Sequence, residues 1–439
     1  MIVPYWLERA ARAKPDRPAL LCAGRTWTQA ELFAQAAGAA GALAARGVGQ
    51  GDRVGLALGP GPEFVLALHG CLLLGAVAVP IDLRLGDAER AALADGCAVL
   101  VDEPLERRGG WRPAGGHDLA ATAVLMHTSG TSAAPKPVPL TYGNLLWSAL
   151  GSAVALGLRD DERWLCAMPL THVGGLSILV RSAIYGTTTV LHERFDSERV
   201  HAVLAAGEAT LVSLVATTLA RLLDGGLARP PALRAALTGG GPVPEPLRER
   251  AAAAGIPVSL TYGLTEAASQ VTSTPAAGIT GRPAAGGPPL FCTRVQIAAD
   301  GEILIAGPTV SAGALAGDGW LHTGDLGALD ADGNLSVTGR AADTIVSGGE
   351  NVAPAQVEAV LERHPGVLEA GVYGVADEQW GELVCARVVT RDEAGVEPAA
   401  LREFCAASLA GFKVPKRIVI TREPLPRTRS GKLLRRELR

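Results

Sequence analysis

The sequence predicts an α/β protein with two domains, and three changes of pattern along the chain support this. Strand-like and helix-like segments alternate from about residue 30 to 290. The pattern changes to hairpins from residue 294, and to a short mixture of helices and strands after residue 340. Alternation predicts parallel sheets with helices on both faces. We therefore expect a large N-terminal domain of stacked αβ subdomains with a small β-rich subdomain, residues 1–340, and a small α+β domain, residues 341–439.

The first expected elements are a helix and a strand close to the N-terminus. Residues 28–48 form an apolar helical pattern that Gly47 ends, and residues 52–58 form a short apolar strand. The longest apolar stretch, residues 64–81, contains His69 and two glycines and closes on the sequence AVAVPID. This composition indicates a buried helix that leads into a buried strand, and not a membrane span.

The alternation then continues through the middle of the chain. Residues 123–127 form a short apolar strand that leaves into a Ser/Thr-rich loop, and Thr141 can cap a helix over residues 142–156. The later strands and helices of this part are expected at residues 163–170, 187–195, 199–208, 210–215, 247–255 and 257–263.

Two hairpins are expected next, because Asp300-Gly301 and Asp332-Gly333 are dipeptides that favour tight β-turns. The last hundred or so residues contain a helix with strands and then the helical pattern PAALREFCAASL. This third pattern indicates the small α+β domain.

Composition excludes several classes of partner. Hydrophobic residues make up 48% and charged residues 19% of the 439 residues, as in a well-buried globular protein. The formal net charge of −4 gives no reason to expect nucleic acid or an anionic membrane as a partner. The seven cysteines lie far apart without a CxxC pair, which argues against structural disulfides and a zinc site. A reducing cytoplasm is therefore the expected compartment. The N-terminal segment lacks the layout of a signal peptide.

The stretch MHTSGTSAAPKPV, residues 126–138, raises the question of a phosphate-binding loop. It is not a Walker A loop, because Pro135 removes a backbone donor directly before Lys136. A different phosphate loop stays open, since hydroxyls, the bare backbone of Gly130 and the charge of Lys136 can all contact phosphate. The hydroxyl residues are Thr128, Ser129, Thr131 and Ser132. A Ser/Thr-rich surface turn is the alternative.

Two glycine-rich segments follow strands of the large domain. In the first, three glycines and a proline leave bare backbone against which a planar ligand could lie, although plain turns have the same composition. These residues are Gly239, Gly240, Gly241 and Pro242. In the second, a loop tip carries Glu266, whose carboxylate could hold Mg²⁺ on a nucleotide or merely cap a helix. The neighbours of Glu266 in this loop are Tyr262, Gly263 and Thr265.

Three segments nearer the C-terminus add charged groups. Asp325 lies in a tight turn flanked by glycines, where it could accept two ribose hydroxyls. Arg340 precedes a glycine pair, Gly348 and Gly349, that lies ahead of a helix. Lys432 directly follows Gly431 in the basic segment of residues 424–438, and a solvated tail lysine is the alternative.

Taken together, these segments resemble the adenylate-forming superfamily of acyl- and aryl-CoA ligases, luciferases and peptide-synthetase adenylation domains. The motifs match in order from about residue 5 to the C-terminus. The resemblance implies that TSGTSAAPKPV is the family's phosphate loop, with Ala133 in place of a glycine. It implies ATP- and Mg²⁺-dependent formation of an acyl-adenylate, followed by transfer to the thiol of CoA. It also implies a mobile small domain that rotates about Ala341-Ala342, where many relatives carry a charged residue.

The same resemblance implies a role for each candidate residue. Lys432 and Thr265 would act on the attacking carboxylate and the α-phosphate, with Mg²⁺ held by Glu266. The phosphate loop with Lys136 would hold the β- and γ-phosphates. Asp325 and Arg340 would contact the ribose, and residues 239–242 with Tyr262 would flank the adenine. Gly348 and Gly349 would face the thiol of CoA.

Three stretches are similar to the o-succinylbenzoate–CoA ligases of menaquinone biosynthesis, a branch of this superfamily: residues 168–186, 239–247 and 262–271. The similarity implies 2-succinylbenzoate as the acid, although Thr171 stands where an aromatic residue is usual. His172 is the candidate that contacts the reacting carboxylate, and a structural histidine is the alternative. Arg181 lies in an apolar stretch and is the candidate partner of a second substrate carboxylate; pairing with a protein acid is the alternative.

Three functions remain open on the sequence alone. The main one is an AMP-forming ligase of 2-succinylbenzoate or another aryl or acyl acid, with a small carboxylic acid, ATP and CoA as its partners. The others are an amino-acid-activating adenylation enzyme and a nucleotide sensor on an inactive ligase scaffold. Retention of the key charged residues argues against the sensor: Lys136, Glu266, Asp325, Arg340 and Lys432. A cytoplasmic protein is expected. The sequence leaves the oligomeric state open between a monomer and a homodimer, and the large domains of this superfamily often pair.

Overall fold

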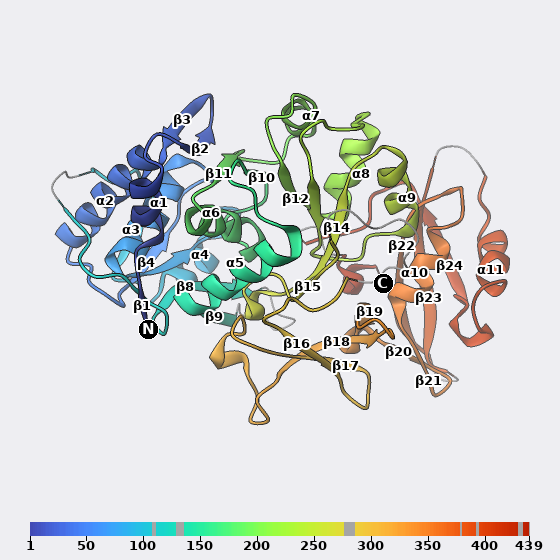
Figure 1. Cartoon of the computed structure of the whole chain (residues 1–439). Coiled ribbons are helices and arrows are strands. Elements are labelled where there is room, and N and C mark those ends of the chain that lie inside the picture. Colours follow the sequence, from blue (N-terminus) through green and yellow to red (C-terminus); the bar gives the residue numbers. More distant parts are fainter. Residues whose placement is uncertain are drawn as a thin grey trace.

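The computed structural model describes residues 1–107, 111–128, 136–275, 286–377, 380–391, 395–428 and 433–438. These residues form a large mixed α/β body and a smaller body near the C-terminus (Figure 1). Two mostly parallel sheets and one antiparallel sheet build the large body, and a mixed five-stranded sheet builds the small one. The predicted fold class is therefore confirmed.

The first sheet of the large body has the strand order β6-β4-β5-β8-β9. Its strands are β4 (Arg53–Leu56), β5 (Val77–Pro80), β6 (Val99–Val101), β8 (Thr122–Thr128) and β9 (Lys136–Thr141). The helix α3 (Pro62–Leu74) packs on this sheet, α2 (Gln29–Ala45) packs between α3 and the strands β2 (Pro18–Cys22) and β3 (Arg25–Thr28) of the second sheet, and α4 (Asp87–Ala94) follows β5. The helix α2 begins where predicted, because the Thr28 hydroxyl accepts from the Glu31 amide while the Glu31 carboxylate accepts from the Thr28 amide. The apolar stretch of residues 64–81 is a buried helix that leads into a buried strand, as expected.

The second sheet has the order β15-β14-β13-β12-β10-β11-β2-β3. Its strands are β2 (Pro18–Cys22), β3 (Arg25–Thr28), β10 (Arg163–Cys166), β11 (Thr188–Leu191), β12 (Leu211–Leu214), β13 (Ala235–Thr238), β14 (Val258–Tyr262) and β15 (Thr272–Ser273). The helices of this part are α1 (Trp6–Ala13), α5 (Tyr142–Leu156), α6 (Val173–Tyr185), α7 (Ser197–Ala205), α8 (Ala216–Asp224) and α9 (Glu245–Ala253). The strands from β14 to β2 are parallel, so their carboxyl ends share one edge.

The third sheet is the predicted β-rich part. It contains β16 (Arg294–Ile297), β17 (Glu302–Ala306), β18 (Leu321–Leu329) and β19 (Leu335–Arg340), all antiparallel. Gly301 and Gly333 have φ angles of +88° and +79°, which confirms both hairpin turns, because such angles favour glycine. Short elements of the large body are β1 (Ile2–Val3), which pairs with β7 (His117–Asp118), and the 3₁₀ helices η1 (Thr265–Ala267) and η2 (Ala312–Ala314).

The small body forms one sheet with two α-helices. Its elements are η3 (Ala341–Asp343), β20 (Ile345–Ser347), β21 (Glu350–Val352), α10 (Pro354–Leu361), β22 (Val367–Asp377), β23 (Gly381–Thr390), α11 (Pro398–Ala406), η4 (Gly411–Lys413), β24 (Arg417–Thr421) and η5 (Arg435–Glu437). Its core is a separate apolar cluster formed by the sheet, α10 and α11. The boundary at residue 340 stays a prediction.

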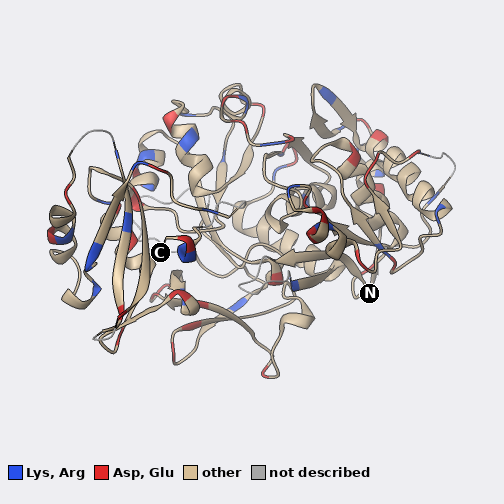
Figure 2. Cartoon of the chain, turned by 180° about the vertical axis from the view of Figure 1, so that it is seen from behind, with Lys and Arg blue, Asp and Glu red and all other residues tan. Residues whose placement is uncertain are grey.

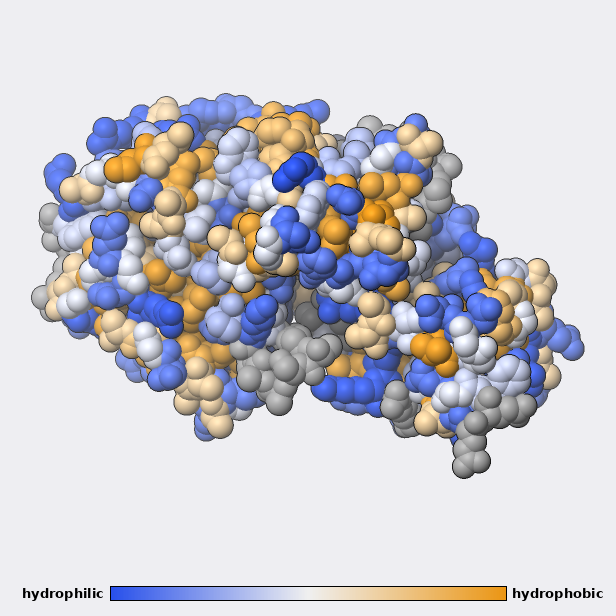
Figure 3. Space-filling model, turned by 90° about the horizontal axis from the view of Figure 1, so that it is seen from below, coloured by the Kyte–Doolittle hydropathy of each residue, from blue (hydrophilic) through white to orange (hydrophobic). Residues whose placement is uncertain are grey.

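Charged residues of both signs occur throughout the fold. Acidic and basic positions are interspersed over both bodies (Figure 2). The view from below shows a hollow near the middle of the molecule (Figure 3). Among the described residues, no helix has the length and apolar character to cross a membrane.

Candidate active site

A carboxylate held by two side chains lies where the second and third sheets meet. The prediction of a tight turn at Asp325 is wrong, because this residue lies within β18 and pairs in register with Arg340 on β19. Asp325 is 7% exposed. The Tyr262 hydroxyl, at the end of β14, donates to Asp325 Oδ2 at 2.7 Å, and Arg340 Nε lies 2.8 Å from Asp325 Oδ1. Burial raises the pKa of Tyr262, and the charge of Asp325 adds to the effect, so the phenol stays a donor. Three predicted residues are thus brought together.

The predicted glycine segment follows β13 at the same edge as Tyr262. The strands β13 and β14 are parallel neighbours, and Thr238 pairs with Leu260. A Cβ on Gly239 would lie 2.7 Å from both the Thr261 carbonyl oxygen and its Cγ2, so only glycine allows this contact of the two segments. Gly240 has a φ angle of +79°. The result is bare backbone beside Tyr262, as the sequence predicted.

The turn that carries Thr265 and Glu266 folds back on Gly263. A Cβ on Gly263 would lie 1.6 Å from the Ser269 carbonyl oxygen, which no rearrangement of a side chain relieves. Residues 265–267 form η1, and the Ser311 amide donates to the Glu266 carbonyl at 2.8 Å. Both candidate side chains are half-buried on this turn. The glycine therefore fixes the position of two predicted site residues.

The predicted phosphate loop is described only at its two ends. Thr128 ends β8 and pairs in register with Lys136, which begins β9. The Thr128 hydroxyl lies 3.5 Å from the Lys136 carbonyl oxygen. The residues between them, including Ser129, Gly130, Thr131 and Ser132, lie outside the described residues, as does Lys432.

His172 is the N-cap residue of α6, and two charged residues that the sequence analysis missed lie near it. Arg84 Nε and Nη2 donate to the carboxylate of Asp82 at 2.6–3.1 Å. Burial alone would raise the pKa of Asp82, but the Arg84 hydrogen bonds outweigh it, with a smaller effect of His172, and the pKa falls. The available signal was an acid and a base directly after a buried strand, in VPIDLRLG.

Arg181 lies on α6 and is buried inside the large body. It is 2% exposed, and its Nη2 donates to the Ser148 hydroxyl at 3.0 Å, while that hydroxyl donates to the Ala268 carbonyl at 2.6 Å. The guanidinium carbon lies 5.6 Å from the centroid of the Trp164 ring. Burial lowers the pKa of Arg181 to about 10, so it remains a cation at pH 7. No described carboxylate forms an ion pair with Arg181, and Arg181 Nε has no hydrogen-bond partner among the described residues.

The candidate CoA residues lie in the small body. Gly348 and Gly349 join β20 to β21 with φ angles of +62° and +82°. The Gly348 amide donates to the Trp380 carbonyl at 2.8 Å, and a Cβ there would lie 3.0 Å from the Trp380 ring. Lys416 Nζ lies 5.7 Å from the centroid of the same ring. An exposed aromatic ring and a cation therefore border the glycine pair.

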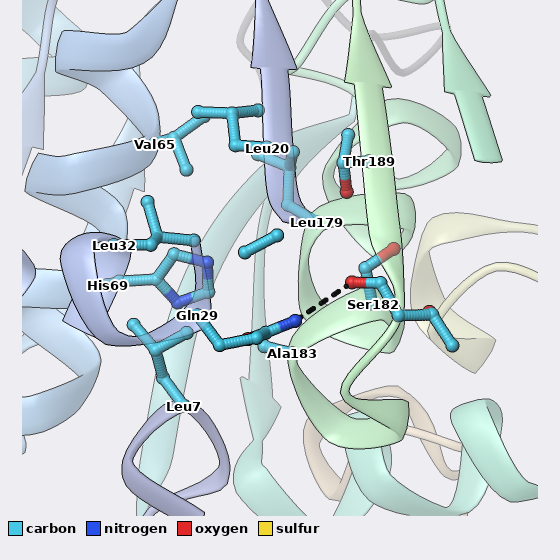
Figure 4. Close-up of a pocket in the computed structure, with 12 residues that line it drawn as sticks. Leu7, Leu20, Gln29, Leu32, Val65, His69, Leu179, Ser182, Ala183 and Thr189 are labelled. Carbon is cyan, nitrogen blue, oxygen red and sulfur yellow. Dashed lines mark hydrogen bonds between the residues drawn. The ribbon is translucent and has the colours of Figure 1, made fainter. Parts of the chain in front are cut away.

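A small internal cavity belongs to the core and not to this site. It lies between α1, α2, α3 and α6 and the strands β2 and β11, with an apolar lining apart from a few polar groups (Figure 4). Gln29 Nε2 donates to the Thr187 carbonyl at 3.3 Å. Burial lowers the pKa of His69 to about 4, so this histidine is neutral at pH 7.

Candidate residues at the carboxyl edge of parallel strands are typical of α/β enzymes that bind nucleotides. The sequence profile described as AMP-binding enzyme matches residues 7–105 and 102–315. The profile described as AMP-binding enzyme C-terminal domain matches residues 356–432. The chain therefore belongs to the AMP-binding enzyme family, which confirms the resemblance found in the sequence.

Individual relatives cover the whole chain. A 2-succinylbenzoate–CoA ligase of Geobacillus kaustophilus (strain HTA426) is 41% identical, over 100% of this chain and 97% of that protein. One of Bacillus subtilis (strain 168) is 38% identical, over 99% of this chain and 97% of that protein. The solved o-succinylbenzoate CoA synthetase of Bacillus subtilis with its acyl-adenylate intermediate has a TM-score of 0.91 and 38% identity, covering 100% of this chain and 98% of that one. The same synthetase with ATP and magnesium has a TM-score of 0.91 and 37% identity, with 100% of both chains covered.

Proposed function

We propose that this chain is an ATP-dependent acid–thiol ligase that joins 2-succinylbenzoate to CoA. In the first half-reaction the carboxylate attacks the α-phosphorus of ATP and displaces pyrophosphate. In the second, the CoA thiol attacks the acyl carbon and displaces AMP, which leaves the thioester. The observation that carries the proposal is the meeting of Tyr262, Asp325 and Arg340 at the carboxyl edge of the parallel strands. Relatives named for this acid support the choice of substrate.

The nucleotide roles follow from the donors and acceptors present. Asp325 is an acceptor that two ribose hydroxyls can share, while Arg340 and the Tyr262 hydroxyl hold its two oxygens in place. Bare backbone at residues 239–242 allows a flat ring to approach closely beside Tyr262. The phosphate loop, residues 128–136, would take the β- and γ-phosphates and release them as pyrophosphate.

The donor set also fits Mg²⁺ bound together with the nucleotide. Within the described ranges, no three His, Cys, Asp or Glu side chains are grouped so as to hold a metal ion. Mg²⁺ on a nucleotide needs only one or two protein carboxylates besides phosphate oxygens and water, and Glu266 can supply one. The ion would neutralise phosphate charge when bound. The Thr265 hydroxyl on the same turn would donate to the α-phosphate, where negative charge collects during attack.

Lys432 and the glycine pair of the small domain would serve different half-reactions. Lys432 would bridge the attacking carboxylate and the α-phosphate during the first. Rotation of the small domain about Ala341-Ala342 would then withdraw the lysine and bring Gly348 and Gly349 to the CoA thiol. The first two residues of η3 are this proposed pivot.

The acyl site would combine His172 with the buried cation Arg181. His172 would contact the reacting carboxylate from the start of α6. Arg181 would meet the second carboxylate of 2-succinylbenzoate, and its Nε, which has no hydrogen-bond partner among the described residues, supports this role. Burying such a cation without an anion is costly, so an anionic substrate would lower that cost.

Replacing Arg181 by Leu should raise the KM for 2-succinylbenzoate by about 10- to 100-fold, because a charge-assisted hydrogen bond is lost. Aromatic monocarboxylic acids should lose much less, since they have no second carboxylate. Steady-state kinetics with both types of acid, after a melting curve has shown an intact fold, make the comparison. An equal loss for diacids and monoacids would reject the direct contact.

An acid panel in the ATP–pyrophosphate exchange assay tests the proposed function. We expect 2-succinylbenzoate to stimulate exchange far more than amino acids or simple fatty acids. Stimulation by an amino acid would favour an amino-acid-activating enzyme. No stimulation by any acid would favour a nucleotide sensor on an inactive scaffold.

We also propose the cytoplasm as the location and a homodimer as the assembly. Seven cysteines without a disulfide support the first. The outer face of α5 exposes Trp147, Leu150 and Val154 without a charged side chain, which supports the second.

A further inference from the structure

The terminal segment that contains Lys432 is closed at its base by described residues. Arg427 and Leu433 form an antiparallel bridge, and the Leu434 amide donates to the Pro426 carbonyl at 2.9 Å. The described residues on either side of this segment are therefore brought together. We call residues 425–427 and 433–438 the hairpin base.

Arg435 connects the hairpin base to two other elements. Its Nη1 lies 3.0 Å from Asp343 Oδ2, at the end of η3, and its Nη2 lies 2.7 and 3.0 Å from the two carboxylate oxygens of Glu358 on α10. Glu358 Oε1 also accepts from the Val372 amide at 2.8 Å. One guanidinium thus joins η3, α10 and the chain end, and Glu358 links them to β22.

The ion pair between Arg435 and Glu358 is largely buried, which makes it costly to break. The side chain of Glu358 is 11% exposed and that of Arg435 is 23% exposed. Burial raises the pKa of Glu358 while Arg435 opposes the rise, so loss of the cation would leave an acid buried without its partner. Lysine cannot replace this arginine fully, because an ammonium does not bond two carboxylates in a fixed plane.

Apolar contacts fix the other side of the hairpin base. Leu425 and Leu438 are buried in a cluster with Tyr373, Cys385 and Val389, and Leu433 packs against it. Gly371 on β22 leaves the space for these leucines, since a Cβ there would lie 2.7 Å from Leu438 and 3.0 Å from Leu425. The leucines set the distance of the base from the sheet, and Arg435 sets its direction relative to η3.

We propose that Arg435 is a positioning residue for Lys432, acting through Asp343 and Glu358. The proposal rests on the role of Lys432 given above. Arg435 follows Lys432 by three residues, and Asp343 follows the proposed pivot residue Ala342 directly. Arg435, Asp343 and Glu358 all lie beyond that pivot, so their contacts travel with the small domain and hold the hairpin base, which flanks Lys432 in the sequence, in one orientation to the hinge. A displacement of about 1 Å at a reacting group can cost about 100-fold in rate, which makes such positioning effective.

The test separates the two half-reactions in Arg435→Met. We expect single-turnover acyl-adenylate formation to fall by about 10- to 100-fold. Thioester formation from supplied acyl-adenylate and CoA should stay within about threefold, because Lys432 has no role there. Arg436→Met is the matched control: it removes the same charge at the next position, where the side chain is exposed, and should leave both rates unchanged. Arg435→Lys should fall between Arg435→Met and the unmodified protein.

Three outcomes would overturn the proposal: equal losses in both half-reactions, undiminished adenylation, or an equal effect of Arg436→Met. Asp343→Asn keeps the test decisive if Arg435→Met does not fold. It removes only the ion pair between Asp343 and Arg435 and should slow adenylation alone. Unchanged adenylation in Asp343→Asn would then overturn it. Lys432→Ala is assayed in parallel, and normal adenylation by that variant would reject the lysine role itself, independently of Arg435.

Discussion

Replacing Lys432 by Ala is expected to slow acyl-adenylate formation by about 100- to 1,000-fold, the size of effect seen when one preorganised donor to a developing charge is removed. Negative charge collects at the α-phosphate as the carboxylate attacks, and the lysine ammonium would stabilise both groups at once. Thioester formation from supplied acyl-adenylate should be nearly unchanged. Rapid-quench measurement of each half-reaction gives the two rates separately.

Lys413→Ala provides a matched control for the lysine, because Lys413 is in the same domain and donates only to Gln356 among the described side chains. This variant should keep both rates. A protein truncated directly before Arg429 loses Lys432 together with Arg435 and the buried Leu438, so its adenylation should fall at least as far as that of Lys432→Ala. If either the truncated protein or Lys432→Ala forms acyl-adenylate at the rate of the unmodified protein, the assigned half-reactions are wrong.

Replacing Gly263 by Ala is the second change with a large expected effect. The added Cβ would lie 1.6 Å from the Ser269 carbonyl oxygen, so the backbone of the turn has to move. Thr265 and Glu266 move with it, and we expect adenylation to fall by about 100-fold or more. Because Glu266 would hold the metal, the concentration of Mg²⁺ needed for half-maximal rate should also rise. Initial rates over a magnesium series measure both effects.

Gly313→Ala is the control for this substitution, since its added Cβ would meet no atom within 4 Å. It should keep the rate, the magnesium dependence and the melting temperature. Gly263→Ala with an unchanged rate and magnesium dependence would contradict the assignment of this turn to the nucleotide. A variant that melts much earlier would instead be compared with the unmodified protein at low temperature, where both are folded.

The predicted site residues that the structure brings together lie next to a recognisable strand end or turn. Tyr262 ends one apolar strand and residues 239–242 follow another, and parallel pairing of β13 and β14 then brings them to one edge. Asp325 and Arg340 were separate predictions, and their direct pairing comes from the register of β18 with β19. Local pattern was therefore sufficient for positions on strands, while the pairing needed the sheet.

Contacts between distant segments were beyond the sequence. His172 at the start of α6 lowers the pKa of Asp82, which follows β5, although 90 residues separate the two in the sequence. Arg435 is 92 residues from Asp343 and 77 residues from Glu358, and no local pattern relates such positions. For Arg181, the apolar surroundings predicted burial correctly, but its contact with Ser148 depends on how α5 packs against α6.

The stoichiometry of the complete reaction shows whether the protein joins 2-succinylbenzoate to CoA by way of an acyl-adenylate. The purified protein is mixed with 2-succinylbenzoate, ATP, Mg²⁺ and CoA, and the products are quantified by chromatography with mass detection. We expect one 2-succinylbenzoyl-CoA and one AMP for each pyrophosphate released, and acyl-adenylate with pyrophosphate alone when CoA is omitted. Release of ADP, or the absence of a thioester while ATP is consumed, would contradict it.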